Sequence, residues 1–140
     1  MKCLSTVRQL SVSLIKMNKQ LILTKVVNHL RAQKCRAGDL LGCRYLDHLG
    51  RKCSAGILIP PEDYNESFER QSLCVKSGNA YEYFSTRYNA QELELIIELQ
   101  NIHDNLPISS WEGEFQRLAT LYTLKLPNLD RKSFEELYER

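Results

Sequence analysis

The stretch from Cys43 to Tyr64 constrains the fold more than any other part of the chain. It places two cysteines, a histidine, two glycines and a double proline between segments with a helical pattern. Leu49-Gly50 predicts a turn, because glycine accepts a positive φ at little cost. Pro60-Pro61 ends any helix or central strand that precedes it. We therefore expect an irregular β-hairpin, with one strand over 44–47 and the other over 52–59.

The expected hairpin has a definite register. If it is centred on His48, Cys43 lies opposite Cys53, and cross-strand partners have Cβ atoms about 4.5–5.5 Å apart. Strand alternation would then place Cys53, Ala55, Ile57 and Ile59 on one face. A short helix over Cys53–Leu58 is the alternative, because the apolar residues of this run fit both structures.

Two segments of the chain carry a resemblance. The first is Cys43-x-Tyr45 followed by Gly50-x-Lys52-Cys53-Ser54-x-Gly56-x-Leu58-Ile59-Pro60 and then Tyr64, and the second is Leu99-Gln100-x-Ile102-His103-Asp104 with Trp111 downstream. Together they resemble a pattern in short uncharacterised proteins of bacteriophages and bacteria. Ser54 stands where that pattern has alanine, and Pro61-Glu62 where it has Asp-Glu.

The resemblance covers roughly Met17 to Leu124. It implies a small phage-type accessory protein with no assigned activity, so no functional residue is carried over from the family. It also places the start of the family's chain near Met17. We therefore expect residues 1–16 to be a loosely ordered N-terminal extension and residues 17–140 to be a single globular domain.

Composition fits one domain in a reducing compartment. The chain has 140 residues, of which 43% are hydrophobic and 26% charged. A chain of this length buries roughly 68% of its unfolded surface, which is enough to fold without a metal or a disulfide. The five cysteines form no CxxC pair, and no apolar run has the length of a signal h-region or a membrane span. We expect a cytoplasmic protein, in the host cytoplasm if it is phage-encoded, with free thiols.

Apolar spacing and capping residues predict a mainly helical α+β fold, with four or five helices packed around one small β-hairpin. Asn18 can cap a helix from Lys19 to about Gln33, and Asn89 with Glu92 predicts a capping box for a helix ending near Asp104. Ser109 or Ser110 is expected to cap a helix from Trp111 to about Leu121, and a short helix is expected over Phe134–Tyr138.

The first 38 residues carry eight basic side chains and no acidic one. Such charge asymmetry can mark an anion-binding segment, so nucleic acid is a possible partner. The alternative is that these side chains pair with acidic helices of the same chain. The segment has no aromatic platform for stacking bases and no helix-turn-helix or zinc-finger pattern. The basic side chains are Lys2, Arg8, Lys16, Lys19, Lys25, Arg31, Lys34 and Arg36.

An aromatic group follows the loop at Gly78. It consists of Tyr81, Tyr83, Phe84 and Tyr88. An exposed aromatic cluster is typical of an interface, whereas a buried one belongs to the core. We name these four residues as the candidate protein-binding surface, with the acidic C-terminal helices as the alternative surface, and leave the core interpretation open.

A zinc site at the hairpin is one candidate chemistry. Cys43, His48 and Cys53 could converge there, with Cys35, Cys74 or His29 as a fourth ligand. Zinc takes such ligands in a tetrahedron, but the spacing C-x₄-H-x₄-C is not that of a standard zinc knuckle. The alternative is that these are free thiols, with Cys74 a small buried apolar residue.

A cysteine nucleophile is the second candidate. Lys52 beside Cys53 would lower the thiol pKa, and His103 could act as the base. We expect that Asp104 cannot easily orient His103, because adjacent helical side chains point about 100° apart. We also expect Glu92, Glu94 and Glu98 to be solvated, which argues against paired carboxylates as catalysts.

These observations lead to a ranked set of functions. We expect a small accessory protein that acts by protein–protein binding, with a host or defence factor as a candidate target, and with no catalysis and no cofactor. A cysteine-dependent hydrolase or transferase using Cys53 and His103 is the first alternative. A nucleic-acid binder using the basic N-terminal segment is the second.

Overall fold

The computed structural model describes residues 19–128. It has the mainly helical α+β architecture expected from the sequence, with four α-helices and one two-stranded antiparallel hairpin in that part of the chain. The N-terminal extension 1–16 and the expected helix at 134–138 lie outside the described residues. No helix within 19–128 combines the length and the apolar character that crossing a bilayer requires.

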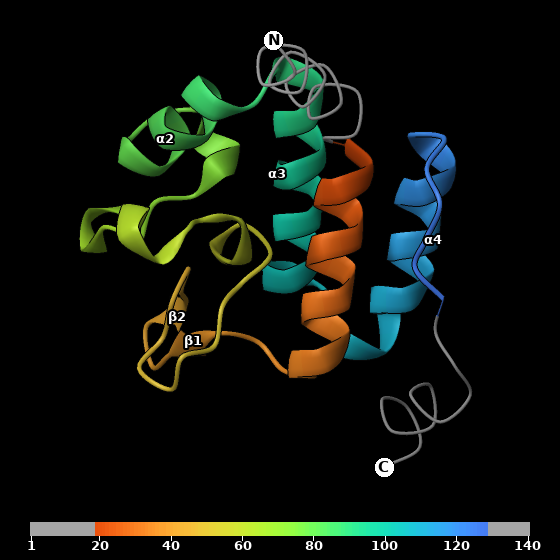
Figure 1. Cartoon of the computed structure of the whole chain (residues 1–140). Helices are drawn as coiled ribbons and strands as arrows, with labels where there is room; N and C mark the ends of the chain where they lie inside the picture. Colours follow the sequence, from red (N-terminus) through yellow and green to blue (C-terminus); the bar gives the residue numbers. More distant parts are fainter. Residues whose placement is uncertain (1–18, 129–140) are drawn as a thin grey trace, which may run out of the picture.

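Three helices form the body of the fold. Residues 19–33 are helical, and we call them the first helix. Figure 1 shows it beside α3 (Ala90–Asn105) and α4 (Trp111–Leu121), with α2 (Asn79–Arg87) on the other side of α3. The core lies between them, because each helix turns a stripe of apolar side chains inward. The fully buried members include Leu23, Leu30, Leu95, Leu99, Phe115 and Leu118.

The local signal for α3 is confirmed, whereas the predicted serine cap of α4 is wrong, because the Ser110 side chain makes no cap hydrogen bond, and Asn18 lies outside the described residues. The Asn89 side chain accepts a hydrogen bond from the Glu92 N–H, and the Glu92 carboxylate accepts one from the Asn89 N–H, which is the expected capping box. Glu92 is buried rather than solvated, so the expectation for this carboxylate is wrong. The capping role pulls its side chain back against the helix start.

The hairpin lies earlier in the chain than the sequence pattern indicated. β1 (Gly38–Asp39) pairs with β2 (Gly42–Cys43), and Gly38 lies opposite Cys43. The tip is Leu40-Leu41, followed by Gly42 at φ 132°, a conformation that suits glycine. The predicted pairing of Cys43 with Cys53 is therefore wrong. Two-residue strands are too short to produce an alternating pattern.

The expected second strand is a chain of turns. Its only ladder contact among the described residues is an isolated bridge between Leu46 and Lys52. Gly56–Leu58 forms a 3₁₀ turn, η1, so the short-helix alternative is nearer the structure than the strand over 52–59. Further 3₁₀ turns follow, and they are η2 (Pro61–Asp63), η3 (Glu66–Phe68) and η4 (Leu73–Val75), with η5 (Ile108–Ser110) before α4.

Candidate functional site: the Cys43–His103–Asp104 cluster

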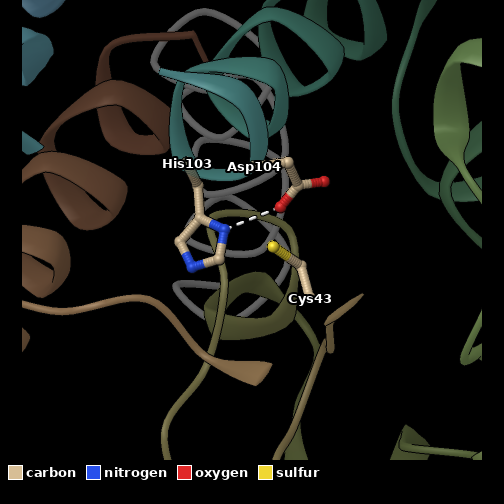
Figure 2. A group of neighbouring side chains, drawn as sticks. All are labelled: Cys43, His103 and Asp104. Carbon is tan, nitrogen blue, oxygen red and sulfur yellow. Dashed lines mark hydrogen bonds and ion pairs between the residues drawn. The ribbon is translucent and has the colours of Figure 1, made fainter. Parts of the chain in front are cut away.

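Three side chains with potential chemistry converge where the hairpin meets the C-terminal end of α3. Cys43 ends β2, and His103 and Asp104 lie in the last turn of α3. One ligand atom of each, the Sγ, a ring nitrogen and a carboxylate oxygen, lies within 4.8 Å of the other two. Figure 2 shows the three groups directed toward one another.

The hairpin is fixed in this position by backbone bonds and by one buried carboxylate. The Arg44 N–H donates to the Ala37 carbonyl at 3.1 Å, which extends the β1–β2 ladder by one bond. Asp47 accepts a hydrogen bond from the Gly38 N–H at 3.0 Å. These bonds hold Cys43 against α3 from the hairpin side.

His103 has a defined protonation pattern. The Ala37 N–H donates to Nε2 of His103 at 3.0 Å, so Nε2 presents its lone pair. A neutral imidazole has one N–H and one acceptor nitrogen, and the proton is therefore on Nδ1. Nδ1 lies 2.7 Å from Oδ1 of Asp104 and donates to it, as the dashed line in Figure 2 marks. The expectation that Asp104 cannot orient His103 is wrong.

The ring of His103 is fully buried and stacked. It lies against Trp111 with ring centroids 5.9 Å apart and an interplanar angle of 27°. The Trp111 Nε1–H donates to the Leu106 carbonyl, and the Arg36 guanidinium donates to the carbonyls of His103 and Leu106. The ring position is thus set by α3, by the start of α4 and by the residues that precede β1.

Asp104 is oriented by uncharged donors. Besides His103, the side-chain amide of Gln100 donates to both carboxylate oxygens at 3.1 Å, and the Gln100 carbonyl oxygen accepts from the Ala55 N–H. Within residues 19–128, no lysine or arginine forms an ion pair with Asp104. Its side chain is 30% exposed, so a partly accessible carboxylate is left without a charged partner.

The Cys43 thiol is protonated at neutral pH. Burial raises its pKa to about 11, and the nearby Asp104 carboxylate acts in the same direction, outweighing the opposite effect of the Arg36 guanidinium. A nucleophilic cysteine requires the opposite electrostatics, namely a cation or a base that lowers the pKa.

Cys53 is still less suited to nucleophilic chemistry. It is fully buried, and burial raises its pKa to about 12 although the Gly56 N–H donates to its sulfur. The two ring nitrogens of His103 are occupied by Ala37 and Asp104. The arrangement offers Cys53 no free base from this histidine.

The predicted zinc ligands are dispersed. His48 is exposed in the turn at 47–51, Cys43 is half-buried, and Cys53 is in the core. Of the proposed fourth ligands, Cys74 is exposed rather than buried, and Nε2 of His29 lies 2.8 Å from the Lys52 carbonyl. In the described part of the chain, the set that converges is Cys43, His103 and Asp104, of which the zinc prediction named Cys43 alone.

Two cavities border the cluster. One, of about 490 Å³, lies between the hairpin, residues 70–72 and the end of α3, and the other, of about 650 Å³, lies between the hairpin and the turn at 47–51. Cys43 and Asp104 line both, and His48 and Arg51 line the second. Solvent and small ligands can therefore approach the cluster from two sides.

The aromatic segment contributes mainly to packing. Phe84 is fully buried, and its ring contacts those of Tyr83 and Tyr88. Tyr81, Tyr83 and Tyr88 are partly buried against the core. The Tyr83 hydroxyl donates to Asp63 at 2.8 Å. This placement favours the core interpretation for Phe84 and leaves only parts of the tyrosines accessible.

The basic segment is partly used inside the molecule. Arg31 forms a bidentate ion pair with Glu112, with N–O distances of 2.8 and 2.6 Å. The Arg36 guanidinium donates to the backbone carbonyls at the end of α3. The Lys19 ammonium donates to the Gln91 side chain. Lys2, Arg8 and Lys16 lie outside the described residues. The intramolecular alternative therefore accounts for Arg31 and Arg36.

Sequence reasoning missed the meeting of Cys43 with His103 and Asp104. A signal was present, because the two segments that carry the resemblance each contain part of the cluster. They also contact each other at further points, since the Ser54 hydroxyl donates to the Leu99 carbonyl and the Ala55 N–H to Gln100. Comparison of the chain with protein-family models, with curated proteins and with solved structures finds no match.

Proposed function

We propose that the protein is a small accessory protein that acts by binding another protein, without catalysis, and that it binds through the tip of the hairpin. The observation that carries this proposal is the exposure of Leu40 and Leu41, whose relative accessibilities are 105% and 81%. Two adjacent leucines projecting fully into solvent leave their apolar surface to be buried by a partner.

The tip is held rigidly by its neighbours. The Asp39 carboxylate accepts a hydrogen bond from the Leu41 N–H at 2.8 Å and forms ion pairs with Arg70 at 2.6 Å and Arg44 at 3.4 Å. A segment that is already ordered loses little conformational entropy when it binds. The leucines are therefore presented on a preformed element.

A third leucine lies on the adjoining turn. Leu49 is 76% exposed, and its N–H donates to the carboxylate of Asp47. The same carboxylate accepts from the Gly38 N–H in β1, so one buried side chain joins both turns. We call Leu40, Leu41 and Leu49 the hairpin surface. Clusters of exposed apolar side chains on a rigid base are typical anchors of protein–protein contacts.

The chemistry of the site supports a binding role over the cysteine-enzyme alternative. Cys43 and Cys53 are both thiols rather than thiolates at neutral pH, and the nitrogens of His103 are occupied. Cys35, Cys43, Cys53 and Cys74 are free, which suits the reducing cytoplasm that we propose as the place of action. The resemblance to short phage and bacterial proteins supports a phage-type origin.

We propose the hairpin surface, rather than the aromatic segment 81–88, as the protein-binding surface. Tyr81, Tyr83 and Tyr88 are partly covered by the core, whereas the leucines are not. The tyrosines remain accessible enough to form the edge of an interface. Nucleic-acid binding loses support, because Arg31 and Arg36 already serve internal contacts.

The test compares capture by matched variants of the full chain. Leu40→Ser with Leu41→Ser removes the apolar tip, and Leu121→Ser is the control, since Leu121 is 62% exposed at the end of α4. Both variants should unfold at nearly the wild-type urea concentration, because neither site contributes to the core.

We expect that a partner protein binds to the wild-type chain and to the Leu121→Ser variant. The same partner should not bind to the Leu40→Ser, Leu41→Ser double variant. The interaction should be reproduced with the purified partner. If the double variant retains every partner that the wild type retains, the hairpin surface is not the binding site.

A further inference from the structure

We propose that Cys43, His103 and Asp104 form a binding site for one thiophilic divalent cation of the Zn²⁺ type. This site is independent of the proposed protein-binding function. It differs from the metal site expected from the sequence, because His103 and Asp104 replace His48 and Cys53 as partners of Cys43.

The donor set fits such an ion. A thiolate, an imidazole nitrogen and a carboxylate oxygen are the three ligand types that zinc binds in proteins. Their atoms already lie within 4.8 Å of one another. Ligands on a tetrahedral zinc ion are about 3.3–3.6 Å apart for bonds of the usual lengths. Nδ1 of His103 and Oδ1 of Asp104, now 2.7 Å apart, must therefore separate, and the Cys43 sulfur completes the three-ligand set.

The charges balance on binding. Cys43 loses its S–H proton to solvent and becomes a thiolate, and Asp104 is already a carboxylate. Two negative ligands offset the double charge of the ion, and the imidazole stays neutral. In the existing cluster Nδ1 of His103 donates a hydrogen bond to Asp104, and the cation takes over the role of joining the three groups.

The surroundings of the Asp104 carboxylate suit the binding of a cation. The side-chain amide of Gln100 fixes the orientation of Asp104, and no described lysine or arginine neutralises it. Hydrogen bonds from neutral groups to a ligating carboxylate are the usual support around metal ligands.

The two cavities supply an entry path and a place for a further ligand. Cys43 and Asp104 line both, so an ion approaching from either side meets these two donors. Three protein ligands and an open position filled by water form a common zinc geometry.

Binding of the cation to His103 requires a change of tautomer and a local displacement of the backbone. The cation needs the lone pair of Nδ1, so the ring proton leaves Nδ1 and is taken up at Nε2 through solvent. Nε2–H would then face the Ala37 N–H that now donates to Nε2. Metal uptake therefore breaks this bond and displaces Ala37, the residue that precedes β1. The cost of this displacement lowers the affinity below that of a fully preformed site.

The experiment titrates the full-length reduced chain with Zn²⁺ against a chromophoric chelator, and native mass spectrometry gives the stoichiometry. We expect one ion per chain. Co²⁺ in place of Zn²⁺ should produce a thiolate-to-metal charge-transfer band and tetrahedral d–d bands. Cys43→Ser and Asp104→Asn should each lower the affinity by more than about 100-fold, beyond the 10–100-fold typical of losing a supporting group.

Three cysteine variants are controls for thiols outside the site. Cys3→Ser, Cys35→Ser and Cys74→Ser should leave binding unchanged. Asp104→Asn preserves the shape of the side chain, so it still tests the site if Cys43→Ser folds poorly. In the wild type, Zn²⁺ should protect Cys43 from alkylation, and the amide signal of Ala37 should shift in the NMR spectrum.

Two results would overturn the proposal. One is the absence of a one-to-one adduct at excess Zn²⁺. The other is an adduct that survives both Cys43→Ser and Asp104→Asn, which would place the ion elsewhere.

Discussion

Gly56 shows how a single position can be fixed by close backbone approach. A Cβ added there would lie 2.0 Å from the carbonyl oxygen of Tyr45 and 2.9 Å from its carbon. Both are backbone atoms, so no side-chain rotation relieves the clash. We expect Gly56→Ala to lower the free energy of unfolding by about 3 kcal/mol, measured by urea denaturation.

Gly113 provides a control of opposite sign. It lies inside α4, and a Cβ there meets nothing within 4 Å. Gly113→Ala should stabilise the protein by about 0.5–1 kcal/mol, because alanine favours the helix. Equal effects of the two substitutions would contradict the close packing of η1 against Tyr45.

Asp47 gives the protein a defined sensitivity to acid. Burial alone would raise the pKa of this carboxyl, but hydrogen bonds from the Gly38, Arg51 and Leu49 N–H groups and from the Arg51 guanidinium outweigh it and lower the pKa to about 2. A pKa depressed by folding stabilises the protein above the unfolded value of 3.8, and this contribution is lost as the pH falls toward 2.

Asp47→Asn isolates that contribution. At pH 7 the variant should be less stable than the wild type by about 2 kcal/mol. The difference should shrink between about pH 4 and pH 2, where Asp47 becomes neutral. Urea denaturation of both proteins across this range is the measurement, and a difference that does not change with pH would exclude the charge as its cause.

Single residues were predicted least reliably where their environment is non-local. Cys74 is of a residue type that is usually buried, yet it is exposed, because the buried residue of η4 is its neighbour Leu73. The hydrogen bond between His103 and Asp104 could not be predicted from helix geometry alone. The backbone amide of Ala37 fixes the ring tautomer, and this contact spans 66 positions of the chain.

Secondary-structure elements were predicted well where their signals are local. The capping box at Asn89 and the first residue of α4 were both found from the sequence, because caps and helical periodicity are encoded within a few residues. The hairpin was misplaced because β1 and β2 have two residues each. Strands of that length are specified by the hydrogen bonds that the Asp39 and Asp47 carboxylates accept from backbone N–H groups, rather than by alternation.

Arg31 joins the first helix to α4 and to the segment that follows α4. Its guanidinium contacts both carboxylate oxygens of Glu112 and donates to the Pro127 carbonyl at 2.8 Å. Lysine cannot make this forked contact. We expect Arg31→Lys to cost about 1–2 kcal/mol of unfolding free energy, measured by thermal or urea denaturation.

Arg117 is the matched comparison for this helix contact. It pairs with Glu114 within α4, and its side chain is 50% exposed. Arg117→Lys should change stability by less than about 0.5 kcal/mol, because exposed ion pairs contribute little. A larger loss at Arg117 than at Arg31 would contradict a stabilising role for the contact between the first helix and α4.

The fold as a whole brings together two segments far apart in the sequence. Residues 43–56 meet the second half of α3 through Cys43, Ser54 and Ala55. This contact places the hairpin at one end of the helical body, as Figure 1 shows. The class of fold follows from composition and periodicity, whereas this junction depends on tertiary contacts that no local pattern encodes.

The junction also relates the two proposals. Ala37 accepts the Arg44 N–H at its carbonyl and donates its own N–H to His103, so it connects α3 to the base of the hairpin. A cation at the cluster would change the hairpin at its base, while a partner would bind at its tip. Each proposal has its own experiment, and the failure of one leaves the other standing.

The most direct measurement of the binding role is site-specific photocrosslinking inside cells. A photoreactive amino acid replaces Leu40 in one strain and Leu121 in another, since both side chains are exposed but only Leu40 belongs to the hairpin surface. We predict a discrete crosslinked partner from position 40 and none from position 121. No adduct at position 40, or the same adducts at both positions, would contradict binding through the hairpin.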